Sequence, residues 1–278
     1  MKLVLSLFSG IDLLGMAFKR TGFCVVSAGD IAFGHDIRDF HAPSGKFDGV
    51  ILGSPCQAWS CVRRGQVTEA EKSSARSLIA EGARVILEAK PSWWLWENVP
   101  SVPSIRIEGY THQRFDLTHR ECGGEMLRRR HFQFGVTKNT VPKENELAWW
   151  NQNGSKLVIH RVNHNGQFTP TPTGEQALKT PWARLCTMFD LPESFELSGL
   201  SRRGKNLAIR NGVPLQMGMV VATTIRDLME GKQPATKICA CDCGRPIASL
   251  KQFLATASCR KRMEHWRKGT NQETLYFK

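Results

Sequence analysis

The stretch FDGVILGSPCQAWS, residues 47–60, decides how the rest of the chain is interpreted. Residues 50–52 are apolar, as in a buried strand, and Pro55 ends that strand because it lacks a backbone N–H and has a fixed φ angle. Cys56 follows on the resulting stiff turn. A parallel α/β sheet would hold a nucleophile at such a place, although a lone cysteine in a turn is more often a small buried residue. The partners of Cys56 therefore decide its role.

Three more apolar segments have the same form, a buried strand followed by a glycine or an acid. They are residues 3–8 before Ser9-Gly10, residues 24–28 before Gly29-Asp30, and residues 93–96 before Glu97. Helical spacing of apolar residues lies between them, at 13–18 and 76–89. This alternation predicts an α/β fold with a Rossmann-like, mostly parallel sheet and helices on both faces. Carboxyl ends of parallel strands share one edge. We therefore expect one site there, containing Gly10, Asp30, Asp36, Cys56 and Glu97.

Charge and cysteine usage restrict the class of partner and the compartment. The 278 residues carry a net charge of +13, which favours a polyanion such as nucleic acid. No apolar run approaches the roughly 20 residues of a membrane span, and the apolar run at residues 3–8 is too short for a signal peptide. Five of the nine cysteines are scattered singly, so we expect a cytoplasmic protein without disulfides.

The first two strands and their connecting helix predict a nucleoside-bearing cofactor. A glycine turn after the first strand lets the cofactor approach the backbone, and an acid after the second takes ribose hydroxyls. Asp12 stands where a second turn glycine is usual. A negative charge at this place argues against a pyrophosphate and favours a cationic or zwitterionic cofactor.

Five motifs follow one another along the chain from Leu3 to about Leu228. They are FSG (8–10), GSPCQAWS (53–60), ENV (97–99), RRRHFQFG (128–135) and RNGVP (210–214). In content and order they resemble the motifs of the cytosine-5 DNA methyltransferases. The resemblance implies an S-adenosylmethionine-dependent enzyme that methylates cytosine in double-stranded DNA after flipping the base from the duplex.

The chemistry of that reaction agrees with the residues present. A thiolate adding to cytosine C6 makes C5 nucleophilic, which assigns Cys56 as the transient nucleophile. A carboxylic acid must relieve the charge at N3, and Glu97 is assigned to this task. Arg128 and Arg130 are the candidates for the O2 oxygen, and residues 58–77 are expected to form a mobile basic loop that closes on the flipped base.

The resemblance also implies the residues that bind the cofactor. Phe8, Ser9, Gly10 and Ile11 would line the methionine moiety, Asp30 would take the ribose hydroxyls, and Asp36 and Ile37 would contact the adenine. Gly53 and Pro55 would form the wall near Cys56, Asn211 and Val213 would close the far side, and Ile31 is a further cofactor-binding residue. Two departures affect this site. Met126 replaces a glutamine that supports the nucleophile loop, and Arg210 replaces a glycine. The cation of Arg210 either faces solvent or favours an acidic variant of the cofactor.

The predicted domains follow from these motifs. Residues 1–136 and 180–230 form the catalytic domain, with an amphipathic helix in the stretch 181–195 that ends at Pro192 and a basic loop at 201–206. Residues 137–179 form a small target-recognition lobe, residues 231–270 a basic zinc-binding tail, and residues 271–278 a disordered end.

The tail carries a candidate metal site. Its proposed ligands are Cys239, Cys241, Cys243 and Cys259, with His265 as a reserve ligand. Four thiolates suit a structural zinc ion, although the C-x-C-x-C spacing is tighter than usual. From Lys232 to Lys278, ten Lys/Arg against three Asp/Glu leave a net charge of +7, which suits contact with phosphates. The alternative is a disordered basic tail with free cysteines.

Two other functions remain open at this point. One branch of the same family modifies transfer RNA with the same motifs, so an RNA cytosine-5 methyltransferase is one alternative. The other is a DNA-binding protein on a methyltransferase fold without catalysis, against which the presence of both Cys56 and Glu97 argues. We expect a monomer of bacterial or phage origin.

Overall fold

The computed structural model describes residues 2–31, 34–60, 66–137, 157, 159, 161, 169–172, 174–232, 245, 256–261 and 274–278. Most of the predicted recognition lobe and of the predicted zinc tail lies outside these residues, so their organisation stays a prediction. Within the described ranges, every helix is too short or too polar to span a lipid bilayer.

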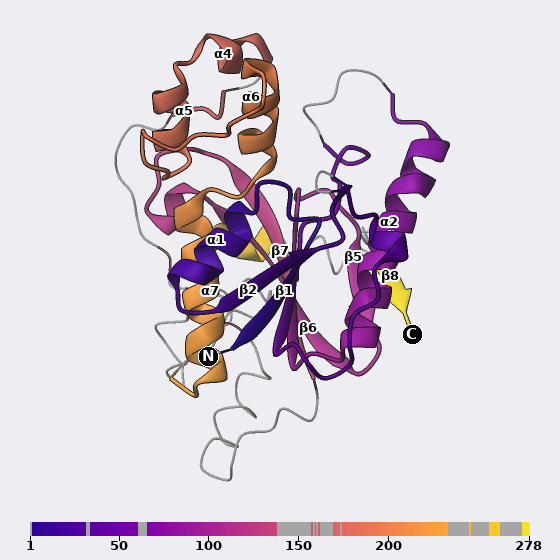
Figure 1. Ribbon diagram of the computed structural model, residues 1–278. Coiled ribbons are helices and arrows are strands. Elements are labelled where there is room, and N and C mark those ends of the chain that lie inside the picture. The colour runs from indigo at the N-terminus through magenta and orange to yellow at the C-terminus, as the bar shows by residue number, and fades with distance from the viewer. Residues whose placement is uncertain are drawn as a thin grey trace.

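A six-stranded sheet forms the centre of the molecule (Figure 1). In spatial order its strands are β2 (Cys24–Ala28), β1 (Leu3–Leu7), β3 (Gly49–Leu52), β4 (Trp93–Asn98), β7 (Arg129–Thr137) and β6 (Tyr110–Thr118). The first four strands are parallel to one another, whereas β7 runs antiparallel to both β4 and β6. The predicted mixed α/β fold with a mostly parallel sheet is therefore confirmed.

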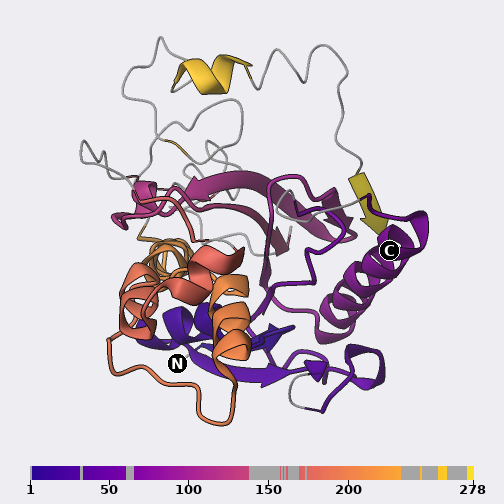
Figure 2. The ribbon, with the colours of Figure 1, turned by 90° about the horizontal axis from the view of Figure 1, so that it is seen from above.

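Helices cover both faces of this sheet, as Figures 1 and 2 show. Helix α1 (Leu13–Arg20) packs with α7 (Leu215–Met229) in one apolar cluster that includes Trp93 and Leu95. Helix α2 (Glu69–Ala89) packs in a second cluster with Trp94 and Trp96. Alternation along β4 thus sends Trp93 and Leu95 to one face of the sheet and Trp94 and Trp96 to the other.

Helix α2 begins earlier than the apolar spacing at 76–89 predicts. Thr68 and Glu71 form a capping box, in which the Thr68 side chain accepts from the Glu71 N–H and the Glu71 carboxylate accepts from the Thr68 N–H. The helix therefore starts at Glu69. The prediction of a basic loop over residues 58–77 is wrong for residues 69–77, which are helical, whereas the described residues 58–60 and 66–68 are not.

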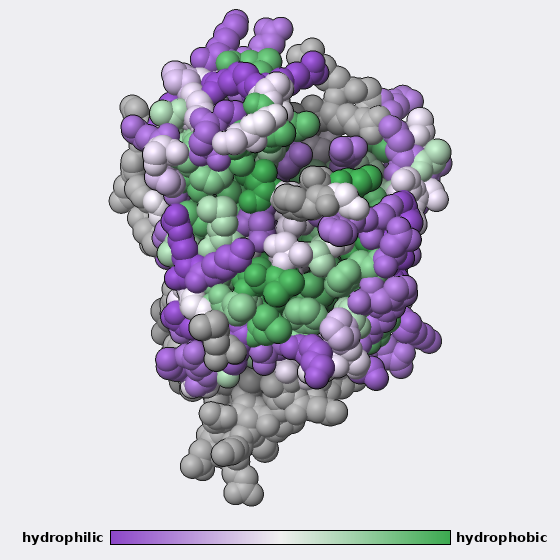
Figure 3. Space-filling view, in the orientation of Figure 1, coloured by the Kyte–Doolittle hydropathy of each residue, from purple (hydrophilic) through white to green (hydrophobic). Residues whose placement is uncertain are grey.

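A small helical lobe stands above the sheet and contains α4 (Gly174–Lys179), α5 (Trp182–Met188) and α6 (Arg202–Asn211). The prediction of a basic loop at 201–206 is wrong. Ser201 caps α6 by accepting from the Gly204 N–H at 3.1 Å, and Ile209 anchors the helix in the core. Hydrophilic side chains gather at the top of this lobe and on the outer side of α2 (Figure 3).

A second, two-stranded sheet joins β5 (Ser104–Ile107) to β8 (Thr274–Phe277). The prediction that residues 271–278 are disordered is wrong for β8. Backbone donors and acceptors at the edge of β5 pair with residues 274–277. Leu275 and Phe277 also pack against the apolar cluster beneath α2. The part of the chain that the structure describes also contains two short 3-10 helices, η2 (Ile37–Asp39) and η3 (Arg120–Cys122).

Candidate active site

The register of the sheet brings Cys56 and Glu97 to the same place. Strands β3 and β4 are parallel neighbours, and Leu52 pairs with Trp96. The turn that carries Cys56 starts immediately after Leu52, and Glu97 comes immediately after Trp96. A Cβ atom at Gly53 would lie 3.5 Å from Oε2 of Glu97, so the turn and the carboxylate are in close proximity.

Side chains of β4 hold the turn that precedes Cys56. Trp96 donates through Nε1 to the Ser54 hydroxyl at 3.0 Å. Asn98 donates through Nδ2 to the Ser54 carbonyl oxygen at 2.9 Å, and its own Oδ1 accepts from the Val99 N–H. All three polar side chains are nearly buried, so these bonds restrict the turn strongly. Sequence reasoning missed the role of Ser54 and Asn98, although Asn98 stands inside the ENV motif.

Glu97 forms an ion pair with Arg130 across the antiparallel strands β4 and β7. The Nε atom of Arg130 lies 2.9 Å from Oε1 of Glu97. Glu97 pairs in register with Phe132, so Arg130 is its diagonal neighbour on the same face of the sheet. Nη1 of Arg130 donates to the Arg129 carbonyl oxygen, and Nη2 has no hydrogen-bond partner among the described residues. That N–H group remains able to contact a ligand.

Arg128 has a different environment from Arg130, although the sequence pattern makes them equivalent. Its Nη2 donates to the carbonyl oxygens of Arg210 and Gly212, the latter at 2.9 Å, and its guanidinium lies over the ring of Phe189. Arg128 therefore ties the start of β7 to the junction of α6 and α7. Burial, followed by the charge of Arg130, lowers the pKa of Arg128.

The pKa values of the two central groups are shifted in the same direction. Burial, and then the nearby carboxylate of Glu97, raises the pKa of the Cys56 thiol, while Arg130 and Arg128 oppose the rise. Burial also raises the pKa of Glu97 against the opposing charges of Arg130 and Arg128. The site thus combines a thiol that needs activation with a carboxyl group that retains its proton more readily than usual.

The turn after β1 forms the predicted cofactor edge. Asp30 accepts from the Gly10 N–H at 2.6 Å, which joins the turns after β1 and β2. Phe8 and Gly10 both have φ angles above 50°, so this turn bends sharply. Asp12, the departure noted in the sequence, accepts from the Ser6 and Ser27 hydroxyls and from the Gly15 N–H at the start of α1. The Asp12 carboxylate therefore caps α1 and also links β1 to β2.

The donor set at this edge fits a cofactor such as S-adenosylmethionine. Ser9 has a buried hydroxyl with no hydrogen-bond partner among the described residues, as expected of a group that awaits a polar ligand. Ile31, directly after Asp30, has a side chain that is 82% exposed and offers an apolar surface to a ligand. Asp36 caps η2 by accepting from the Arg38 N–H at 2.9 Å, and Ile37 is buried.

The predicted far wall of the pocket lies beside the start of α1. Gly212 approaches Leu13 so closely that a Cβ atom there would lie 2.6 Å from Leu13 Cδ1. Val213 is buried in the core and Asn211 is exposed at the end of α6. Ile11 packs on the cluster that also contains Leu13, whereas Pro55 is exposed.

Met126 stands where the resemblance implies a supporting glutamine. Its side chain is fully buried in an apolar cluster with Leu13, Ala17 and Leu185. Its backbone N–H donates to Nδ1 of His119, and Nε2 of His119 lies 2.8 Å from the carboxylate of Asp190. Apolar packing on the helical lobe therefore occupies this position in place of a polar contact.

The predicted zinc site lies largely outside the described residues, which include Cys259 but not Cys239, Cys241 or Cys243. The Cys259 sulfur accepts from the Thr256 hydroxyl at 3.1 Å and lies 3.5 Å from Arg245 Nη1. In the ranges that the structure describes, no group of three His, Cys, Asp or Glu residues has a metal-binding arrangement. The zinc site stays a prediction.

Known methyltransferase sequences match part of this chain. Residues 3–123 match the family model of the C-5 cytosine-specific DNA methylases. The matched region contains both Cys56 and Glu97. Over 119 residues the chain is also 32% identical to the type II methyltransferase M.FnuDI of Fusobacterium nucleatum, a match over 37% of this chain and 34% of that relative. The chain thus spans about a third of the length of this curated relative.

Solved structures extend the similarity of fold beyond residue 123. A prophage-encoded E. coli protein, described as a DNA modification methyltransferase, superposes with a TM-score of 0.58 at 14% identity, over 83% of this chain and all of that one. Dnmt2 of S. pombe superposes with a TM-score of 0.52 at 15% identity, over 83% of this chain and 99% of its own. At these identities the similarity concerns the fold.

Proposed function

We propose that this protein methylates C5 of cytosine in double-stranded DNA, using S-adenosylmethionine. One observation carries the proposal: the turn with Cys56 and the Glu97–Arg130 pair meet at the carboxyl ends of neighbouring parallel strands. The family match over residues 3–123 and the net charge of +13 agree with a DNA substrate.

The residues present support a covalent route. The Cys56 thiolate adds to C6 of a flipped cytosine, which increases electron density at C5, while Glu97 gives a proton or a hydrogen bond to N3. Arg130 is the better candidate for the O2 oxygen, because it lies beside Glu97 and its Nη2 is available. Nη2 of Arg128 binds two carbonyl oxygens, and only the other N–H groups of Arg128, among them its buried Nε, could contact a ligand. S-adenosylmethionine, when bound, supplies the methyl group to C5. A base then removes the C5 proton, the C5–C6 double bond re-forms, the Cys56 sulfur leaves as a thiolate, and any proton given to N3 returns to Glu97.

The residues proposed to hold the cofactor lie in three segments. Ser9 and Gly10 would contact the methionine end, Asp30 and Ile31 the ribose, and Asp36 with Ile37 the adenine. The buried Ser9 hydroxyl and the exposed Ile31 side chain support this assignment. Asn211 and Val213 are proposed to close the pocket.

Labelled S-adenosylmethionine tests the function directly. The full chain is incubated with duplex DNA or transfer RNA, and the label is counted in each nucleic acid. Label in DNA, followed by bisulfite sequencing to find the site, supports the proposal. Label in transfer RNA alone replaces it with the RNA alternative. A covalent adduct with DNA containing 5-fluorocytosine, lost in Cys56→Ser and kept in Cys24→Ser, excludes a non-catalytic DNA-binding protein.

For the tail, we propose a zinc ion held by Cys239, Cys241, Cys243 and Cys259, which supports contact with DNA phosphates. The donors around the Cys259 sulfur suit a metal-bound thiolate. Elemental analysis of the purified full chain and of Cys243→Ser tests the site. About one zinc per wild-type chain, reduced in the variant, is expected for a four-thiolate site. Absence of zinc from the wild type contradicts it.

A further inference from the structure

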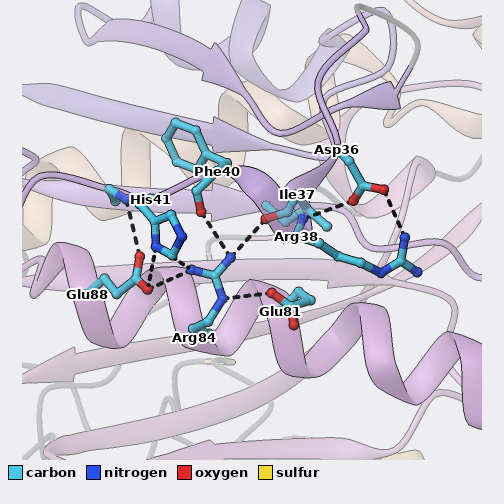
Figure 4. Close-up of polar contacts among 9 residues, drawn as sticks. Asp36, Ile37, Arg38, Phe40, His41, Glu81, Arg84 and Glu88 are labelled. Atoms are coloured by element: carbon cyan, nitrogen blue, oxygen red, sulfur yellow. Dashed lines mark hydrogen bonds and ion pairs between the residues drawn. The ribbon is translucent and has the colours of Figure 1, made fainter.

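Arg84 on α2 reaches across to the segment that follows Asp36 (Figure 4). Its Nη2 donates to the carbonyl oxygen of Ile37 at 2.9 Å and to that of Phe40 at 3.0 Å. One planar guanidinium group therefore holds both ends of the η2 turn.

The remaining N–H groups of Arg84 are held by two carboxylates of the same helix. Nε lies 2.7 Å from Oε2 of Glu81, and Nη1 lies 2.6 Å from Oε1 of Glu88. Glu88 in turn lies 3.1 Å from Nδ1 of His41 and accepts from the Ala42 N–H at 3.3 Å. The side chains of Arg84, Glu81 and Glu88 are each less than a third exposed, so the network is partly shielded from solvent.

The network supplies the side-chain hydrogen bonds that hold the backbone of the segment from Asp36 to Ala42. It lies between β2 and β3 and pairs with no strand of the sheet. Its backbone bonds within the turn are local, from Asp39 to Asp36 and from Phe40 to Ile37. The polar contacts that tie it to a rigid element come from α2. Ile37 and Ala42 are also buried in the apolar cluster shared by α2, β1 and β3, and Ile37 approaches Gly29 in the turn beside Asp30.

We propose that Arg84 is a positioning residue for the cofactor, which sets the place of Asp36 and Ile37 at the adenine end of the pocket. The inference rests on the proposed function, because it takes this segment as part of the S-adenosylmethionine site. Arg84 itself acts from the far side of the segment, through the carbonyl oxygens of Ile37 and Phe40. Its removal therefore affects cofactor affinity more than the steps at Cys56.

Lysine cannot replace this arginine. A lysine ammonium retains the positive charge between Glu81 and Glu88 but has no planar fork that spans two carbonyl oxygens and two carboxylates. Arg84→Lys thus tests the geometry of the group separately from its charge. Arg226→Lys is a matched control, because Arg226 also donates to a backbone carbonyl, that of Thr21 at 3.1 Å, but lies on α7 against the opposite face of the sheet.

Calorimetric titration with S-adenosylhomocysteine measures the effect without turnover. We expect about tenfold weaker binding in Arg84→Lys, equal to about 1.4 kcal/mol, and unchanged binding in Arg226→Lys. The stoichiometry from the same titration separates a folding defect, which lowers the number of sites, from a weaker site. Steady-state kinetics should show a raised KM for S-adenosylmethionine at an unchanged kcat.

The outcomes separate this inference from the proposed function. Failure of the wild type to bind S-adenosylhomocysteine contradicts the proposed function, and the inference with it. Binding by the wild type with the same Kd in Arg84→Lys overturns the inference alone. An equal loss of affinity in Arg84→Lys and Arg226→Lys also overturns the inference, because such a result would show that general destabilisation causes the loss. A lowered kcat with an unchanged KM for S-adenosylmethionine in Arg84→Lys likewise overturns the inference.

Discussion

Nε of Arg130 lies 2.9 Å from Oε1 of Glu97, and the two residues come from antiparallel strands whose register makes them diagonal neighbours. The pair lies beside the turn that carries Cys56, and the charge of Arg130 counteracts the rise in the pKa of both Cys56 and Glu97. It is the electrostatic centre of the candidate site.

Arg130 and Arg128 should respond differently to removal. Arg130→Ala removes the available Nη2 donor and the partner of Glu97, so we expect a loss of kcat on the order of 10²–10³ with little change in stability. Arg128→Ala leaves the carbonyl oxygens of Arg210 and Gly212 without their donor and should cost about 1–3 kcal/mol of stability. Single-turnover kinetics and urea unfolding measure the two effects. Equal losses of kcat with no loss of stability would contradict the assignment.

The rate of methyl transfer should depend on pH through Cys56 and Glu97. Nucleophilic attack needs the thiolate, and the raised pKa of Cys56 makes that form increase as the pH rises. Protonation of N3 needs the acid form of Glu97, which is lost as the pH rises through its raised pKa. We therefore expect a bell-shaped profile of kcat/KM for DNA, with apparent pKa values that belong to the coupled pair.

Glu97→Gln provides the test of that profile. Glutamine donates a hydrogen bond but has no proton to lose, so the rate should fall by roughly 10²–10⁴ and the fall at alkaline pH should disappear. Persistence of the same alkaline limb in Glu97→Gln would assign it to another group.

The turn before Cys56 should lose its position in Asn98→Ala. This change removes the donor to the Ser54 carbonyl oxygen and the acceptor for the Val99 N–H. We expect the covalent adduct with 5-fluorocytosine DNA to form about 10–100-fold more slowly, since displacement of a reacting group by about 1 Å has effects of this size. Thr224→Ala, which removes a nearly buried hydroxyl on α7, serves as the control and should form the adduct at the wild-type rate.

Glu121 should stabilise the fold at neutral pH. Although burial alone raises its pKa, Arg161, the Thr118 N–H and Arg245 together hold the pKa of Glu121 below its usual value of 4.5. A lowered pKa means that the charged form contributes stability above that value and that the contribution is lost as the pH falls through the native pKa. Glu121→Gln should therefore lower the free energy of unfolding by about 1–3 kcal/mol at pH 7.

Urea unfolding of wild type and Glu121→Gln at pH 7 and at pH 3 measures this difference. The gap between the two proteins should shrink at the lower pH. A gap that stays constant would show that the ion pairs with Arg161 and Arg245 do not cause it.

The sequence by itself determined the four parallel strands of the sheet and the two residues at its edge. Apolar runs such as Val50 to Leu52 and Trp93 to Trp96 are buried on both faces, and only a parallel sheet covered by helices satisfies such runs. Pro55 follows the end of β3, and Gly10 follows the end of β1. The carboxyl-end rule then placed Cys56 and Glu97 together, in agreement with the register of β3 and β4.

Only the tertiary structure decided between residues that the sequence treats alike. Arg128 and Arg130 carry the same charge and alternate along one motif. Arg128 reaches the carbonyl oxygens of Arg210 and Gly212, far along the chain, whereas Arg130 reaches Glu97. The same holds for Arg84, which is one of several charged residues on α2 until the chain brings Ile37 and Phe40 against it. Contacts of this kind depend on side-chain direction and on segments distant in sequence, which local patterns do not encode.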